Sequence, residues 1–411
     1  MENSSAAILD NVLLADGRHT RIRLDGATIV AIDDATTPAL PHVGTPRLDL
    51  GGALLLPGLF DGHLHLDKTL IGLPWMPHAA EPTRMSRIET DHKTFPFLTL
   101  STEQRAINLI RRCAGNGSAH LRSHVDIDTV AQLKNLEGVL AARERCKAYA
   151  DVQLVAFPQS GVMRRHGTLE LLDAAIGMGA DLVGGIDPGE IDRDPRGQLD
   201  GIFAIADKRG VGLDIHLHEP GELGLFNVQE ICARTKALGL AGKVTVSHGF
   251  CLGDVIESKA RQAAELMGKC GVMLVTHGAA GWSLPPITVL REHGVTVFAG
   301  NDDVRDTWSP YGTGDVLERA ALIGWRADFR RDDQMKIAYE MITSEAAKAF
   351  GVQDHDIRVG AKANFFSIEA SSMPEALAGY PRRKLVFHNG CVVARDGVAL
   401  DAPLTIAEVA R

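Results

Sequence analysis

The chain has 411 residues, of which 45% are hydrophobic and 23% charged, and its formal net charge is −9. This length exceeds a usual single domain but fits one barrel-type domain with a small companion, and the composition is that of a globular protein. The negative charge argues against nucleic acid and anionic membranes as partners, and no apolar run approaches the length of a membrane span.

The six cysteines are scattered along the chain and show no CxxC spacing. That usage is typical of a reduced protein without disulfides. The opening residues 1–5 lack the basic stretch and apolar core of a secretory signal. We therefore expect a cytoplasmic protein.

Short β-prone runs, separated by Gly and Asp, occur near both ends of the chain. They are residues 7–9, 11–14, 20–24 and 28–32 at the start, and 364–368 and 385–393 towards the end. Neither group can form a core alone, so the two groups are expected to pair. We predict a small β-sandwich domain built from residues 1–54 and 356–411, with a catalytic domain at 55–355 between them.

Strands and amphipathic helices alternate through that central part. After an apolar strand that carries His63, the predicted strands are 120–127, 152–157, 181–186, 212–218, 243–248, 272–277 and 295–300. The predicted helices are 101–113, 130–146, 169–178, 199–208, 228–238, 254–267, 286–293 and 336–350. Eight such strands predict an α/β protein with a closed (β/α)8 TIM barrel; an open doubly wound sheet is the alternative. Polar residues at most strand ends favour the barrel.

Residues 75–98 form a long, Pro-containing stretch without clear periodicity. Such a stretch is either an active-site loop over the barrel mouth or a surface insertion. The pattern does not choose between them.

The strongest chemical signal is the pair His63 and His65. Residues i and i+2 of a strand point to one face, so both imidazoles can meet a divalent metal. Taken alone, the pair also fits two ordinary histidines at a strand end. Further imidazoles and polar groups follow the later strands: His124, Asp126, Gln159, Asp187, His216, His218, Glu219, Ser247, His248, His277, Asp302 and Asp303. Because strand ends ring one mouth of a barrel, together they predict a metal site.

These motifs resemble the amidohydrolase superfamily, and within it the cytosine deaminase branch. The resemblance covers essentially the whole chain, and its motifs are His63-x-His65-x-Asp67, Ser123-His124-x-Asp126, Phe157-Pro158-Gln159, His216-x-x-Glu219, Ser247-His248 and Asp302-Asp303-Val304 up to Trp308. The branch also holds hydrolases of N-alkylammelides, which are s-triazines. Lys68 and residues 181–188 resemble those enzymes, whereas Glu219 resembles the cytosine deaminases.

The resemblance implies one divalent metal ion, zinc or iron, held by His63, His65, His216 and Asp302. Strand geometry alone leaves His216 and His218 as alternatives, since both lie on one face; the family pattern chooses His216. No lysine ends the fourth strand. A carbamylated lysine bridging two metals therefore has no candidate there.

The resemblance also implies roles in hydrolytic deamination by water activated on the metal. The implied catalytic residues are Glu219 as the proton shuttle, His248 as a hydrogen-bonding partner of the attacking oxygen, the ligand Asp302, and Asp303 as the partner of the leaving amine. Gln159 offers a donor and an acceptor to a cyclic amide edge, and Trp308 would wall the flat ring. We expect His124 and His277 to be structural or supporting residues, and leave Lys68 and His218 without a role.

We predict a metal-dependent hydrolase that deaminates a cytosine-like pyrimidine or a related aminated N-heterocycle. The alternative is an N-alkylammelide amidohydrolase that releases an alkylamine; hydrolysis of a cyclic amide and a non-catalytic homologue rank lower. His218 stands where cytosine deaminases have an acidic residue, which leaves the identity of the ring open. The expected partners are a small heterocyclic substrate and further copies of the chain.

Overall fold

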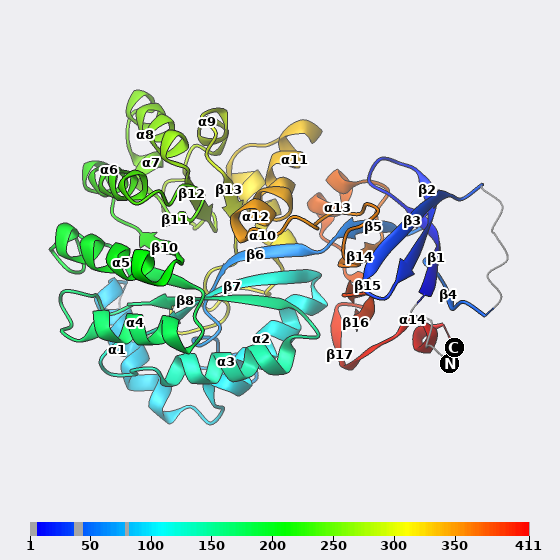
Figure 1. The fold of residues 1–411 in the computed structure, drawn as a ribbon, viewed down its shortest axis with the longest axis horizontal. Coiled ribbons are helices and arrows are strands. Elements are labelled where there is room, and N and C mark those ends of the chain that lie inside the picture. Colours follow the sequence, from blue (N-terminus) through cyan, green and yellow to red (C-terminus); the bar gives the residue numbers. More distant parts are fainter. Residues whose placement is uncertain (1–5, 37–43, 79–81, 411) are drawn as a thin grey trace.

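The computed structural model describes residues 6–36, 44–78 and 82–410. The opening residues 1–5, on which the signal-peptide prediction rests, lie outside this part. The chain forms two sheets, a parallel barrel from its middle and a mixed sheet from its two ends (Figure 1).

The barrel has eight strands in sequence order, and each pairs in parallel with the next. They are β6 (Leu59–Leu64), β7 (Ser118–Asp126), β8 (Asp151–Phe157), β9 (Leu182–Ile186), β10 (Gly212–Leu217), β11 (Val244–His248), β12 (Val272–Thr276) and β13 (Val297–Ala299). A parallel bridge between Leu64 and Asp302 links the last strand segment to the first. The predicted closed barrel, rather than the open sheet, is thus confirmed.

Helices surround the barrel (Figure 1). They are α2 (Thr102–Gly115), α3 (Lys134–Cys146), α4 (Thr168–Met178), α5 (Pro195–Arg209), α6 (Gly221–Ala237), α7 (Cys251–Asp254), α8 (Glu257–Cys270), α9 (Ile287–Glu292), α10 (Val316–Arg326), α11 (Asp332–Glu340) and α12 (Ser344–Phe350). A capping box opens α2, where the Ser101 side chain accepts from the Gln104 N–H at 3.2 Å and the Gln104 side chain accepts from the Ser101 N–H at 3.0 Å. Leu, Ile, Val and Ala side chains from strands and helices form one continuous core.

The second sheet has nine strands, in the order β17-β16-β15-β14-β5-β1-β2-β3 with β4 paired to β1. Its strands are β1 (Ala6–Leu13), β2 (His19–Asp25), β3 (Thr28–Asp34), β4 (Arg47–Asp49), β5 (Leu54–Pro57), β14 (Phe365–Ile368), β15 (Arg383–His388), β16 (Cys391–Arg395) and β17 (Val398–Leu404), flanked by α13 (Met373–Gly379) and α14 (Ile406–Val409). The antiparallel pair β5 and β14 joins the two chain ends. The predicted pairing of the ends is therefore confirmed, as one mixed sheet in place of the expected sandwich.

The chain passes from this sheet to the barrel at Gly58, so the boundary expected after residue 54 falls inside β5. The N–H of Gly58 donates to the carbonyl of Asn364 at 2.9 Å, and a Cβ at this position would lie 2.7 Å from Ala119 Cβ. Only glycine fits between the two sheets here.

The stretch 75–98 contains a helix that its sequence did not predict, α1 (Arg84–Thr94), followed by the short 3-10 helix η1 (Phe95–Phe97). The side chain of Thr83 caps α1 by accepting from the Ser86 N–H at 3.2 Å. Only Ile88 and Asp91 of α1 are buried, which explains why no apolar periodicity marks it. Its contacts, described below, place it over the barrel mouth.

Two further expectations can be compared with the described part of the chain. All six cysteines lie in it and are free. Every helix in it is too short or too polar to cross a lipid bilayer.

Candidate active site

The four residues expected to hold a metal converge at the carboxyl ends of three strands. His63 lies on β6 with His65 just beyond it, His216 lies on β10, and Asp302 follows β13. The Asp302 Oδ1 is 3.4 Å from His63 Nε2 and 3.3 Å from His65 Nε2. The ring of His216 lies with its centroid 4.7 Å from that of His63 and 5.5 Å from that of His65. All four side chains are buried.

Asp302 owes its position to the closure of the barrel. Its N–H donates to the carbonyl of His63 at 2.7 Å, and its φ of 62° lies in the left-handed region. A non-glycine residue rarely adopts this conformation, and such residues concentrate at functional sites. The backbone bond therefore sets the carboxylate of Asp302 against the imidazoles of β6.

The protonation states suit a metal centre. Burial lowers the pKa of His65 to about 3 and the pKa of His216 well below its usual value, so both imidazoles are neutral near pH 7. Burial opposes ionisation of Asp302, but His277 and His63 hold its pKa well below the ordinary value. His63 Nε2 and His216 Nδ1 have no hydrogen-bond partner among the described residues. Neutral imidazole nitrogens beside a carboxylate fit a divalent metal.

A layer of side chains beneath the site fixes the orientation of His63. The Nδ1 of His63 is 3.1 Å from the Ser247 hydroxyl, which donates to Asp214 Oδ1 at 2.5 Å. Arg122 in turn lies 3.1 Å from Asp214 Oδ2. Such outer contacts hold metal-binding imidazoles in one tautomer and orientation.

His124 lies inside the group of imidazoles, with its ring centroid 4.2 Å from that of His63 and 4.4 Å from that of His216. Phe157 stacks on the ring of His216, with the two centroids 4.0 Å apart. Both contacts restrict the rotation of His216. This position is compatible with the supporting role expected for His124.

His248 and His277 lie together on the side of Asp302 that faces away from His65. The two Nδ1 atoms are 3.1 Å apart, and His277 Nδ1 is 3.2 Å from Asp302 Oδ2. His248 has a φ of 74°, and its Nε2 has no hydrogen-bond partner in the described part of the chain. His277 is thus a direct neighbour of the predicted ligand Asp302, which was not predicted from the sequence. The sequence feature that could have indicated this is the position of His277 at the end of β12.

His218 is oriented by Asp187, which follows β9. Its Nδ1 is 2.8 Å from Asp187 Oδ2, and its backbone N–H donates to Asp187 Oδ1 at 2.7 Å. The ring stacks on His248 at 4.3 Å. His218 therefore supports the ring of His248. These contacts join His218 to Asp187 and His248, and not to Asp302.

Glu219 is fully buried directly after β10. Its Oε1 accepts from the N–H groups of Gly189 at 2.7 Å and Glu190 at 2.6 Å, and its Oε2 accepts from Asn227 Nδ2. Burial, with a smaller contribution from Asp187, raises the pKa of Glu219 to about 7. The described hydrogen bonds of this carboxylate lead to the β9 loop and α6, and none leads to the four predicted ligands.

The two residues expected to bind substrate, Gln159 and Trp308, meet around Lys68. Lys68 Nζ donates to Gln159 Oε1 at 2.7 Å and lies 4.6 Å from the centroid of the Trp308 ring. It is also 3.6 Å from Asp126 Oδ1, and the Lys68 side chain is 1% exposed. Burial works against its charge, yet Asp126 and Asp91 raise the pKa of Lys68 above its usual value. The Nε2 of Gln159 has no hydrogen-bond partner among the described residues.

Asp303 links the two groups of residues. Burial, Asp306 and Asp302 together raise the pKa of Asp303 well above its usual value. Burial also raises the pKa of Asp306 to about 6, although that carboxylate accepts from the N–H groups of Trp308 and Ser309, each at 2.8 Å. Asp303 therefore keeps a proton more readily than an ordinary aspartate does.

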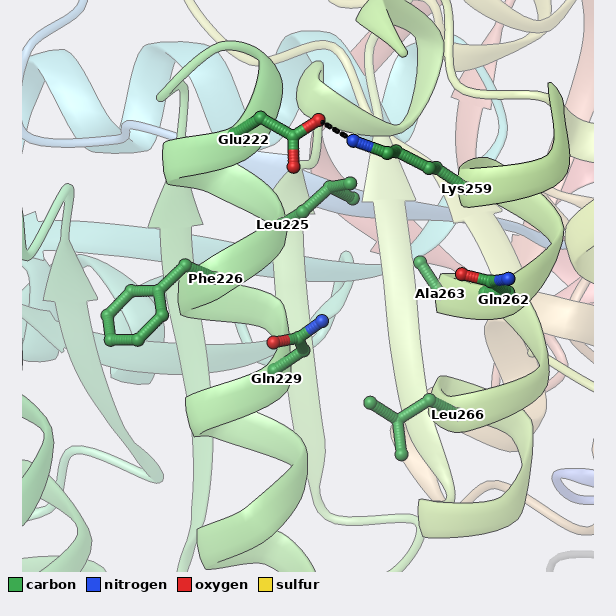
Figure 2. Close-up of a pocket in the computed structure, with 8 residues that line it drawn as sticks. All are labelled: Glu222, Leu225, Phe226, Gln229, Lys259, Gln262, Ala263 and Leu266. Atoms are coloured by element: carbon green, nitrogen blue, oxygen red, sulfur yellow. Dashed lines mark hydrogen bonds and ion pairs between the residues drawn. The ribbon is translucent and has the colours of Figure 1, made fainter. Parts of the chain in front are cut away.

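Two cavities elsewhere in the structure contain none of these residues. The larger, of about 220 Å³, is a groove between α6 and α8, which Glu222 and Lys259 bridge across its top (Figure 2). The other, of about 170 Å³, is lined by His120 and Asp151 at the start of β7 and β8. The candidate site is therefore defined by side chains that converge at the barrel mouth, and not by either of these two cavities.

Comparison with known proteins agrees with this geometry. The model of the family described as "Amidohydrolase family" matches residues 48–393. N-isopropylammelide isopropyl amidohydrolase of Pseudomonas sp. (strain ADP) is 32% identical over 357 residues, which cover 86% of this chain and 89% of that one. The crystal structure of N-isopropylammelide isopropylaminohydrolase from Burkholderia multivorans ATCC 17616 is 40% identical, with a TM-score of 0.92, and the match covers 96% of this chain and all of that one.

A crystal structure of 5-methylcytosine deaminase from Klebsiella pneumoniae shares the fold, with a TM-score of 0.83 at 23% identity over 96% of this chain and 99% of that one. The family match includes every barrel strand and every residue of the candidate site. Since the motifs, the closed barrel and this match agree, the chain belongs to the amidohydrolase family, as the resemblance implied.

Proposed function

We propose that this protein is a metal-dependent hydrolase that cleaves the exocyclic C–N bond of an aminated N-heterocycle. The observation that carries the proposal is the convergence of three imidazoles and one carboxylate beside a second group of polar side chains that surrounds Lys68. The first group suits a metal that activates water. The second suits the edge and face of a flat ring.

His63, His65, His216 and Asp302 would hold the metal. A divalent metal bound there would supply Lewis acidity and lower the pKa of water to about 7, so that a nucleophile would be available at neutral pH. These donors fit zinc as well as ferrous iron, since both accept imidazole and carboxylate ligands.

The group around Lys68 would bind the ring. Because Lys68 occupies the oxygen of Gln159, the free Nε2 of Gln159 is left to donate to an acceptor on the ring edge. Trp308 offers its face to the ring plane. One amide donor, one ammonium and one aromatic face recognise a cyclic amide or amidine better than an open-chain amide.

Two carboxylates would move protons, and one imidazole would stabilise the attacking oxygen. With a pKa near 7, Glu219 is populated in both forms at neutral pH, so it can take a proton from water and give it to a ring nitrogen. To do so its carboxylate must turn from the N–H groups of Gly189 and Glu190. The free Nε2 of His248 would hydrogen-bond the attacking oxygen, and Asp303 would pass a proton to the departing amine.

Two substrate classes compete. The relatives at 32% and 40% identity are named for N-isopropylammelide, which favours an N-alkylated s-triazine and release of an alkylamine. The sequence alone placed a cytosine-like base first, and Glu219 and the shared fold of 5-methylcytosine deaminase keep that class as the second candidate. Hydrolysis of a cyclic amide is third. The homo-oligomeric state and the cytoplasmic location stay predictions.

The test is a parallel assay of protein reconstituted with zinc or ferrous iron. Cytosine, isocytosine-type bases, ammelide and N-alkylammelides are supplied, and free amine and intact ring are both measured. We expect amine release with the ring intact, fastest from the alkylated triazines. Turnover of cytosine alone would rank the cytosine-like base first and the N-alkylated s-triazine second. Ring opening without amine release, or inactivity on all four classes after metal loading, would contradict the proposal.

A further inference from the structure

Helix α1 lies outside the barrel, yet charged side chains at its two ends reach the loops after β7 and β9, which form part of the mouth. His92 Nε2 is 2.8 Å from Asp128 Oδ2, after β7. Arg84 Nε is 3.2 Å from Asp187 Oδ2, after β9, and Arg84 also pairs with Glu190. These ion pairs fix α1 across the mouth at both of its ends. The helix can therefore present a residue from its middle to the site beneath.

Asp91 is the buried acid of α1, with 3% of the residue exposed. Its Oδ2 accepts from the indole Nε1 of Trp308 at 2.8 Å, and its Oδ1 accepts from the hydroxyl of Thr307. The same Oδ2 is 3.9 Å from Lys68 Nζ. Burial raises the pKa of Asp91, while Lys68 and the two hydrogen-bond donors oppose this rise. One carboxylate thus touches the ring of Trp308 at its polar end and the ammonium of Lys68.

Those two contacts fix the relative placement of the ring-binding residues. Trp308 Nε1 is tied to Asp91, so the indole cannot turn about its side-chain bonds without losing a charge-assisted hydrogen bond. Lys68 lies between the Trp308 ring, at 4.6 Å, and the oxygen of Gln159, at 2.7 Å. Asp91 therefore acts on Trp308 directly and on Gln159 through Lys68.

We propose that Asp91 is a positioning residue for substrate binding, which holds Trp308 and Lys68 in the arrangement that receives the ring. This proposal rests on the proposed function, because it takes Trp308 and Lys68 to be the groups that meet the substrate. Asp91 does not touch the predicted metal ligands in the described contacts. Its loss should therefore weaken binding of the ring and leave the chemical step in place.

The experiment compares Asp91→Asn with Glu89→Gln in the metal-loaded protein. Both variants lose one carboxylate from α1. Glu89, however, is exposed, and its ion pair is a 3.9 Å contact with the exposed Lys93. We expect KM to rise roughly ten- to hundredfold in Asp91→Asn with kcat within about threefold, because a charged hydrogen bond in a buried site contributes on that scale. Glu89→Gln should keep both values. A purely structural role of Asp91 would lower the melting temperature without separating KM from kcat.

A double-mutant cycle with Trp308→Phe tests the connection itself. Because Asp91 acts through the indole N–H as well as through Lys68, Asp91→Asn should raise KM less in the Trp308→Phe protein than in the wild type; fully additive effects would contradict the proposal. An unchanged KM in Asp91→Asn would overturn it as well. If the wild-type protein turns over none of the heterocycles, the proposed function fails. The Asp91 to Trp308 connection is then read from acrylamide quenching of fluorescence in a protein whose other tryptophans, Trp75, Trp282 and Trp325, are replaced by Phe. Equal quenching with and without Asp91→Asn in that protein would overturn the proposal.

Discussion

The two halves of the barrel mouth are built in different ways. The imidazole half, His63, His65, His216, His248 and Asp302, lies on strand ends or within three residues of them. The ring-binding half consists of Lys68, Asp91, Gln159 and Trp308. Only Gln159 lies as close to a strand end, whereas Lys68 and Trp308 come from positions further along their loops and Asp91 comes from α1. The first is held by the backbone hydrogen bonds of the barrel, and the second by side-chain contacts between segments far apart in the chain.

Their electrostatics differ as well. The imidazole half sets His65, His216 and His248, which burial keeps neutral near pH 7, around one ionised carboxylate, Asp302. The ring-binding half contains one ammonium, Lys68, among several carboxyl groups, Asp67, Asp91, Asp126 and Asp303. Under the proposed function, the strand-end half performs the chemistry and the loop-built half chooses the substrate, so that relatives named for a triazine and for a cytosine can share one barrel.

The largest effect is expected in the imidazole half. His216→Ala removes one of four predicted ligands, so the protein should lose most of its metal, and kcat should fall about ten-thousandfold or more. Metal content by plasma mass spectrometry and amine release are measured together. The control is His166→Ala, which alters an exposed histidine. A His216→Ala protein that keeps full metal content and activity would remove His216 from the ligand set.

The next largest effect distinguishes the proposed proton transfer by Glu219 from metal binding. Glu219→Gln keeps the size of the side chain and should lower kcat about a hundred- to ten-thousandfold, the usual contribution of general acid–base catalysis, with metal content unchanged. Glu222→Gln, an exposed acid three residues further along, is the matched control.

The pH profile gives the sign of this effect. The pKa of Glu219 is raised to about 7, and the carboxylate form is needed to accept a proton from water. In the wild type, kcat/KM should therefore increase with pH through a midpoint near 7, and this limb should be absent in Glu219→Gln. The same limb in both proteins would assign it to another group.

A smaller effect is expected in the ring-binding half. Lys68→Met removes the ammonium that separates Asp91 from Asp126 and holds Gln159. We expect KM to increase roughly ten- to hundredfold, and the free energy of unfolding to fall by about 3 kcal/mol, because buried carboxylates lose their partner. Urea unfolding and steady-state kinetics measure the two. Lys93→Met, at an exposed site of α1, should change neither.

The same division decides what could be predicted from the sequence. His63 and His65 could be placed because the strand period of two puts them on one face in any sheet. Asp302 could be placed because counting eight strands puts it at the same mouth. These inferences need only the geometry of the barrel, so the fold and the convergence of the predicted ligands follow from local patterns.

Partner choice across loops could not be predicted. Lys68 and Gln159 are 91 positions apart, and nothing local pairs them. The orientation of Glu219 depends on the N–H groups of Gly189 and Glu190, in another loop. Helix α1 was missed because it buries only Ile88 and Asp91, so its apolar face is one residue wide. Polar helices are stabilised by caps and ion pairs that a hydrophobic period does not show.

The smallest expected effect tests whether the stability of α1 influences substrate binding by the ring-binding half. Thr83→Ala removes the side-chain cap of α1, which costs about 1 kcal/mol of helix stability. Since α1 presents Asp91 to Trp308, part of this loss should reach substrate binding, and KM should rise by less than about fivefold while kcat and metal content stay unchanged. Hydrogen exchange of the α1 amides should speed up in the same variant. Faster exchange with an unchanged KM would show that α1 covers the mouth without setting its ring-binding half, which would confine the role of Asp91 to anchoring the helix.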